Sequence, residues 1–296
     1  MSLEPGVLAP VSVAGAWYAW GMRRRRLHLV GARRDPADLW RPAAFYAALL
    51  TIFAALVLLD KAADELLWAH MVQHALLMLV AAPLVVVSAP WLTFWRPLPL
   101  GFRRAVAGAL VLSPRLRWLR ACARLLASPI GAFVLFNGDL ALWHLPWLYD
   151  LTLADAGVHY AEHVSFIVFA VVFWAQMLDS PPFRCRLDHV RRALYATAGA
   201  AASWVLAVVL ALASSPLYSA YASLPSRPGG ISALADQQLA GGVMWGPGSI
   251  PYALVVFWAI YRWLDDEEPR RRRAHAARTG ASAPRRRAAR ESGNTL

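Results

Sequence analysis

The sequence predicts an all-α integral membrane protein, built as one bundle of seven transmembrane helices. The chain has 296 residues, of which 58% are hydrophobic and 16% charged, and its mean hydropathy is +0.42. A soluble domain of this size would carry charge on about a quarter of its residues. The charged residues are also clustered between long apolar segments, and such segments are typical of helices that cross a lipid bilayer.

Seven apolar segments are candidate spans, and with their loops they make residues 1–263 one transmembrane domain. The first span is short and is followed, not preceded, by Arg23–Arg26. This is the opposite polarity to a cleavable signal peptide, so we expect a retained helix. Residues 264–296 are rich in Arg, Ala and Ser and are expected to form a disordered cytoplasmic tail. The spans are expected at 7–22, 42–59, 66–90, 124–145, 158–178, 193–215 and 238–263.

The basic residues predict the orientation of this bundle. Apart from Lys61 and Arg227, every Lys and Arg lies after the first, third or fifth span or in the C-terminal region. Positive residues mark the cytoplasmic side, so the N-terminus is expected outside and the C-terminus inside. The net charge of +12 then reflects topology and anionic lipid headgroups, which argues against nucleic acid as a partner. Residues 102–126 are expected to lie on the cytoplasmic surface as an amphipathic helix.

The third span contains the feature around which the other spans are arranged. Trp68–Pro90 has no charged side chain, and His70 and His74 stand four residues apart on one helix face, with Met78 one turn deeper. Two stacked imidazoles near a membrane boundary are costly without a partner. For this pair alone, a metal ion and a hydrogen bond to a neighbouring helix both remain open.

The predicted topology brings five of the eight histidines to the outer ends of three consecutive spans. Independent core histidines would have no reason to gather at one membrane face, so we expect an extracytoplasmic metal site. Polar side chains near these histidines are expected to orient the ligands: Gln73 and Glu162 within the two pairs, Asp139 below His144, and Asp236 at the start of the seventh span. The expected ligands are His70, His74, His144, His159, His163 and Met244.

The ligand types favour copper, with zinc as the alternative. Imidazole suits zinc, copper, iron and nickel, and a thioether ligand favours Cu(I) in particular. The only two cysteines, Cys122 and Cys185, fall in predicted cytoplasmic loops. We therefore expect neither a structural disulfide nor a thiolate copper motif at the outer face.

Four strings of the sequence resemble the CtaG family, the bacterial multi-span assembly factors of caa(3)-type cytochrome c oxidase. The resemblance runs from about Pro42 to Trp263. It implies a multi-pass protein of the bacterial cell membrane that matures a respiratory-chain oxidase by delivering copper, with the oxidase subunits and an extracytoplasmic copper donor as partners. The five histidines match the family's histidine positions, and Asp236 and Met244 lie in its last motif. The strings are HMVQH at 70–74, LWHLPWLYD at 142–150, HYAEH at 159–163 and DQQLAGGVMW at 236–245.

Binding and transfer, not catalysis, are the expected mechanism, and two alternatives stay open. A seven-span zinc hydrolase would use three histidines and a bound water, with Asp236 or Glu162 as general base. A metal-ion transporter would need polar residues at the membrane midplane, where Asn137 and Asp139 are the candidates.

Overall fold

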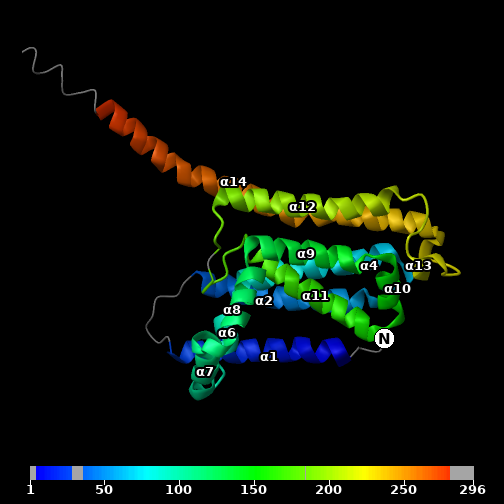
Figure 1. Ribbon diagram of the computed structural model, residues 1–296, viewed down its shortest axis with the longest axis horizontal. Coiled ribbons are helices and arrows are strands. Elements are labelled where there is room, and N and C mark those ends of the chain that lie inside the picture. Colours follow the sequence, from blue (N-terminus) through cyan, green and yellow to red (C-terminus); the bar gives the residue numbers. More distant parts are fainter. Residues whose placement is uncertain (1–4, 29–35, 184, 281–296) are drawn as a thin grey trace, which may run out of the picture.

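The computed structural model describes residues 5–28, 36–183 and 185–280, and in these ranges the chain is helical apart from turns and one isolated β-bridge. The α-helices, with several π-helical and 3₁₀ turns between them, form a bundle of long, roughly parallel rods (Figure 1). In chain order they are α1 (Pro5–His28), α2 (Ala37–Phe53), α3 (Asp60–Glu65), α4 (Leu67–Ala75), α5 (Ala82–Ser88), α6 (Trp91–Trp95), α7 (Leu100–Ala107), α8 (Arg117–Leu126), α9 (Pro129–Trp143), α10 (Pro146–Ala154), α11 (Ala156–Trp174), α12 (His189–Leu212), α13 (Ser219–Ala222) and α14 (Ala233–Gly280).

Five helical segments of the described chain are long and apolar enough to cross a membrane, and a bent pair could form a sixth. The pair is α8 and α9, which meet at 73° inside the fourth predicted span. Ser128 and Pro129 cause this break, because the Ser128 side chain accepts the Gly131 N–H at 3.1 Å and proline favours the first turn of a new helix. The five segments are Leu39–Leu58, Leu67–Ser88, Ala156–Trp174, His189–Leu212 and Ala233–Pro269.

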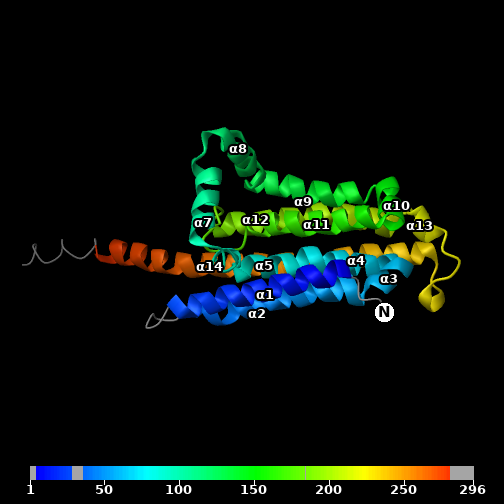
Figure 2. The same cartoon turned by 90° about the horizontal axis from the view of Figure 1, so that it is seen from below.

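The first predicted span does not qualify as a candidate, although it forms most of helix α1. Its apolar run is short, and the helix continues into Arg23–Arg26. Figure 2 shows α1 lying alongside α2, so α1 belongs to the bundle whatever its relation to the bilayer. Seven spans were expected, whereas five or six segments of the described chain are long and apolar enough to cross a membrane.

Segment Leu67–Ser88 lies at the centre of the bundle, in contact with α2, α11 and α14. A π-helical turn, η2 (Leu76–Ala81), joins α4 to α5 just before Pro83. The Ala82 N–H bonds to the carbonyl of Leu77, five residues back, so the Met78 carbonyl is left to accept the indole N–H of Trp174 at 2.8 Å. Such π-helical turns are frequently found at functional sites.

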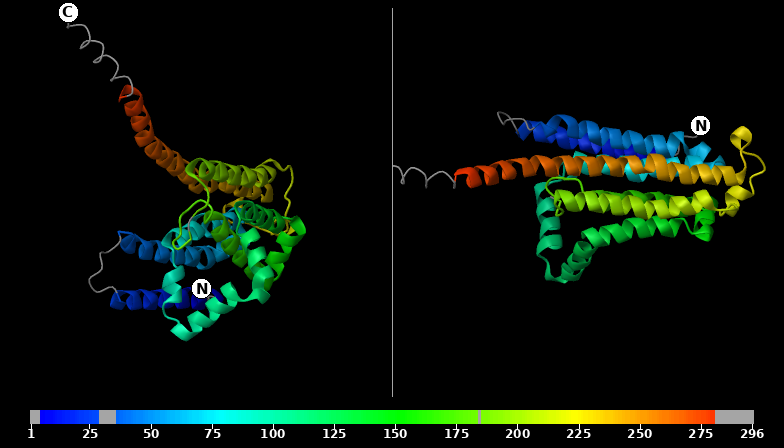
Figure 3. Two further views of the ribbon diagram at one scale, coloured as in Figure 1. Left: turned by 60° about the vertical axis from the view of Figure 1, so that its left-hand side comes forward. Right: turned by 90° about the horizontal axis from the view of Figure 1, so that it is seen from above.

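The two ends of the bundle differ in character. The starts of α4 and α11 share one end with α10 and α13, whereas α7, α8 and the C-terminal part of α14 lie at the other (Figure 2). Helix α14 projects beyond the bundle as far as Gly280 (Figure 3), so the predicted disordered tail begins as helix. Arg and Ala are strong helix formers, which accounts for the difference. Residues 281–296, the rest of the predicted tail, lie outside the described residues.

Candidate metal centre

Two helices bring together the two histidine pairs that the sequence singles out. Helix α4 supplies His70 and His74, and α11 supplies His159, Glu162 and His163. One possible ligand atom from each of these five residues lies within 4.8 Å of the others. The i, i+4 spacing places each pair on one helix face, and contact between the two faces closes the group. We call these five residues the His–Glu cluster.

The four imidazoles of the His–Glu cluster form a compact group. Ring centroids are 4.3 Å apart within each pair, and 5.2 Å and 5.3 Å apart for His70–His159 and His74–His163. The Glu162 carboxylate lies 3.8 Å from Nε2 of His74 and 4.0 Å from Nε2 of His159, which is too long for a hydrogen bond. His70 and Glu162 are fully buried.

Most polar atoms of the cluster lack a hydrogen-bond partner within the described structure. They include Nε2 of His70, both ring nitrogens of His74, Nε2 of His163 and both carboxylate oxygens of Glu162. Buried polar groups are nearly always hydrogen-bonded, so each exception calls for an explanation. A cation held between the imidazoles and the carboxylate would satisfy several of these atoms at once.

Tyr221 of α13 fixes the orientation of His70, and sequence reasoning did not identify it. The Tyr221 hydroxyl donates its proton to the Ala63 carbonyl, which can only accept. Burial raises the pKa of this hydroxyl above its usual value, so it keeps that proton. Its oxygen therefore accepts the Nδ1–H of His70 at 2.9 Å, which leaves the Nε2 lone pair directed away from this bond, toward the cluster.

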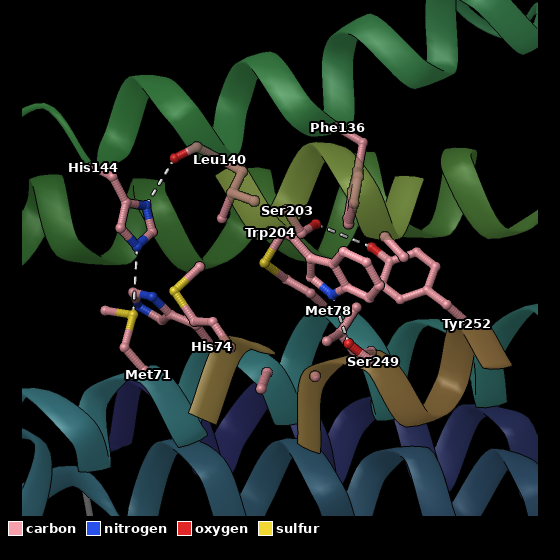
Figure 4. A pocket seen from close by; sticks show the side chains of 15 residues that line it. Met71, His74, Met78, Phe136, Leu140, His144, Ser203, Trp204, Ser249 and Tyr252 are labelled. Atoms are coloured by element: carbon pink, nitrogen blue, oxygen red, sulfur yellow. Dashed lines mark hydrogen bonds between the residues drawn. The ribbon is translucent and has the colours of Figure 1, made fainter. Parts of the chain in front are cut away.

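The fifth predicted histidine, His144, lies beside the cluster and outside it. It follows the last residue of α9, and its ring centroid is 6.4 Å from that of His74. Its Nε2 contacts the sulfur of Met71 at 3.4 Å (Figure 4). Met244, the predicted thioether ligand, lines the same small cavity as His144. Of the six predicted ligands, four thus meet in the cluster, and two lie in the adjacent cavity.

Two of the residues predicted to orient the ligands, Asp139 and Gln73, bond to neighbouring helices instead of to an imidazole. Asp139 accepts from Trp143 and Ser165, each at 3.0 Å, and Ser165 also contacts the Glu162 carbonyl, so Asp139 reaches α11 without touching an imidazole. Gln73 donates to the Ala55 carbonyl at 3.0 Å and so joins α4 to the preceding span. Both hold the helices that carry the cluster.

Asp236 caps helix α4 from a distant part of the chain. Its carboxylate accepts the N–H groups of Leu67 and Trp68 at 2.9 Å and 3.0 Å, the first two of that helix. Arg227 lies 3.9 Å from the same carboxylate. Asp236 therefore sets where α4 begins, one turn before His70. Glu162 differs from the other three supporting candidates, because the structure places it among the possible ligands.

A wide opening leads to the cluster between α1, α2, α10 and α11. Its volume is about 600 Å³, and His159 and His163 form part of its wall. Asp60 and Asp64 also line it. Carboxylates along such an opening raise the local concentration of cations.

The fold and this site define a class: helical membrane proteins with a buried His–Glu cluster at one end of the bundle. Residues 16–266 match the family described as cytochrome c oxidase caa3 assembly factor (Caa3_CtaG), and the chain belongs to that family. The resemblance seen in the four sequence strings is confirmed.

Two curated relatives extend the comparison. The chain is 25% identical over 196 residues to an uncharacterized protein of Mycobacterium bovis, and equally to one of Mycobacterium tuberculosis. The aligned region covers 66% of this chain and 29% of each relative, so the chain corresponds to less than a third of their length. No solved structure matches the chain.

Proposed function

We propose that this protein binds copper in the His–Glu cluster and delivers it to a caa3-type cytochrome c oxidase during assembly. One observation carries the proposal: five buried or half-buried ligand groups lie within 4.8 Å of one another, and most of their polar atoms lack a hydrogen-bond partner. Membership of the oxidase assembly family supports the choice of process. Copper is preferred because imidazole-rich sites bind it more strongly than other divalent first-row metals.

The proposal includes a topology of seven spans, with α1 as the first and the cluster near the outer face of the bacterial cell membrane. The bundle end that carries Arg23–Arg25, α7 and α8 would face the cytoplasm, in accordance with the positive-inside rule. The cluster lies at the opposite end. Copper donated outside the cell would enter through the opening lined by Asp60 and Asp64.

Delivery follows from the number of ligands. A Cu(I) ion takes at most about four ligands, whereas the cluster offers five. The ion can therefore exchange one ligand while it keeps the others, and a receiving subunit that offers better ligands can extract it. The protein binds and transfers in this scheme and catalyses no bond change.

The test is the metal content of the detergent-purified full chain after loading with Cu(I) and, separately, with Zn(II). The wild type is compared with His70→Ala/His74→Ala and with His189→Ala, whose imidazole pairs with Asp266 away from the cluster. We expect about one copper or more per chain in the wild type and in the His189 variant, whereas the double variant should bind at least one copper fewer and no zinc.

Transfer is tested by incubating the copper-loaded protein with the purified copper-receiving subunit of the oxidase. Copper should appear in the subunit faster than it does from free chelate. Zinc held tightly without copper would favour the zinc hydrolase instead. Failure to bind either metal would overturn the proposal.

A further inference from the structure

The strongest unexplained feature outside the His–Glu cluster is a cavity of about 40 Å³ on the far side of His74. A buried water needs about 10–15 Å³ of such volume, so the cavity has room for an ion. Three methionines line it, Met71, Met78 and Met244, together with the imidazoles of His74 and His144. Figure 4 shows His144 above and Met71 with His74 below, on facing helices.

The tautomer of His144 is determined by its contact with Leu140. Nδ1 lies 2.8 Å from the Leu140 carbonyl, which only accepts, so Nδ1 carries the proton and donates it. In the neutral ring, Nε2 then has a lone pair. This lone pair faces the Met71 sulfur at 3.4 Å, and a thioether has no proton to give. Two acceptors therefore face each other in a buried site.

A soft metal ion between these two atoms would resolve the conflict. With metal–nitrogen and metal–sulfur bonds of about 2.0 Å and 2.3 Å, a separation of 3.4 Å corresponds to an angle of about 104° at the metal. That angle is close to tetrahedral. Thioether and imidazole together select Cu(I), whereas Zn(II) prefers the nitrogen and oxygen donors of the cluster.

We propose that His144 and Met71, completed by Met78 or Met244, form a second binding site that is selective for Cu(I). This second site rests on the proposed copper function and adds a second copper-binding position to it. His74 belongs to the cluster and also lines the cavity, and both of its ring nitrogens lack a hydrogen-bond partner. Ligand exchange at His74 passes Cu(I) between the two sites without a change of oxidation state.

The experiment counts bound ions in the full-length, detergent-purified chain. Cu(I) is titrated against a chromophoric chelator, Zn(II) is measured separately, and X-ray absorption reports the sulfur ligands of copper. We expect two Cu(I) but one Zn(II) per chain in the wild type, with a copper–sulfur shell. Met71→Leu, which keeps the volume of the side chain, should retain one Cu(I), lose the sulfur shell and keep its zinc.

Two further variants separate the sites. Met177→Leu changes an equally buried methionine away from the cavity and should behave as the wild type. His159→Ala/His163→Ala removes two of the four imidazoles of the cluster but leaves His144 and Met71, so it should lose zinc and retain one sulfur-ligated Cu(I).

The outcomes distinguish the two proposals. If the wild type binds Cu(I) through nitrogen alone, and Met71→Leu changes neither the count nor the spectrum, the second site is overturned while the copper function stands. If the wild type binds no copper, the proposed function fails, and the second site fails with it.

Discussion

The hydroxyl of Tyr221 lies 2.9 Å from Nδ1 of His70, although 151 residues separate them in sequence. Because this hydroxyl gives its own proton to the Ala63 carbonyl, it can only accept from His70. The contact makes Nε2 the available ligand atom of His70 before any metal arrives. Partners of this kind orient metal-binding histidines and raise their basicity.

Tyr221→Phe should weaken metal binding about 10- to 100-fold, the usual effect of losing such a partner. The number of ions bound at saturation should not change, because the ligands remain. Competition titration with a chelator measures the affinity. Tyr195→Phe is the matched control, since Tyr195 donates to the Pro129 carbonyl at 2.8 Å, remote from the cluster. Equal affinities for the wild type and Tyr221→Phe would contradict the orienting role.

Glu162→Gln should affect the metal-free and metal-loaded protein in opposite directions. Without metal, its unfolding temperature should equal or exceed that of the wild type, because a fully buried carboxylate without a hydrogen-bond partner is removed. With metal, the stability that the variant gains from metal binding should be smaller than in the wild type, by about 1.4 kcal/mol for each tenfold loss of metal affinity. Thermal melts with and without Cu(I) measure both effects.

The control for this prediction is Glu65→Gln, which removes a carboxylate of α3 outside the cluster. It should leave the metal-induced shift unchanged. A Glu162→Gln protein that gains as much stability from copper as the wild type would show that the carboxylate is not a ligand.

Asp236→Ala should lower stability rather than metal affinity. The loss of a helix cap costs about 0.5–2 kcal/mol, and the loss of the ion pair with the half-buried Arg227 adds to this cost. Thermal unfolding and metal titration of the folded fraction measure the two quantities separately. A large loss of affinity at an unchanged unfolding temperature would instead support the predicted role of Asp236 in orienting ligands.

The pair of Asp179 and Arg192 predicts a pH-dependent stability at the opposite end of the bundle. Burial raises the pKa of Asp179, but hydrogen bonds from Arg192 at 3.1 Å and 3.3 Å and from the Cys185 N–H outweigh it, so the pKa lies below its ordinary value of 3.8. Because the pKa of Asp179 is lower in the folded protein than in the unfolded chain, its ionised carboxylate stabilises the fold at pH values above the pKa of the unfolded chain. This stabilisation is lost as the pH falls through the pKa of the folded protein.

Asp179→Asn should therefore lower stability at pH 7 by about 0.2–1 kcal/mol, a small effect because the carboxylate is half exposed. The difference from the wild type should shrink as the pH falls below 3.8 and vanish once the wild-type carboxyl is also protonated. Thermal melts over a pH series from 7 downward test this, and an equal difference at every pH would contradict the assignment.

The local sequence pattern was sufficient to predict part of the site. The spacing of His70 and His74, and of His159 and His163, places each pair on one face because the helix repeats every 3.6 residues. The length of the apolar runs was sufficient to predict the segments that contain α4, α11, α12 and α14. It failed at Ser128, where a capping side chain and a proline break the fourth predicted span. Beyond residue 264, where the Arg- and Ala-rich composition predicted a disordered tail, α14 continues as helix to Gly280.

By itself the sequence determined that the protein is a helical membrane protein, which family it belongs to, and which histidines share a helix face. Those properties depend on composition, motifs and short-range geometry. Only the tertiary structure decided that His144 faces Met71, that Tyr221 fixes the tautomer of His70, and that Asp236 caps α4. Each of these depends on a contact between helices whose relative rotation and depth no local pattern encodes, because they result from packing of the whole bundle.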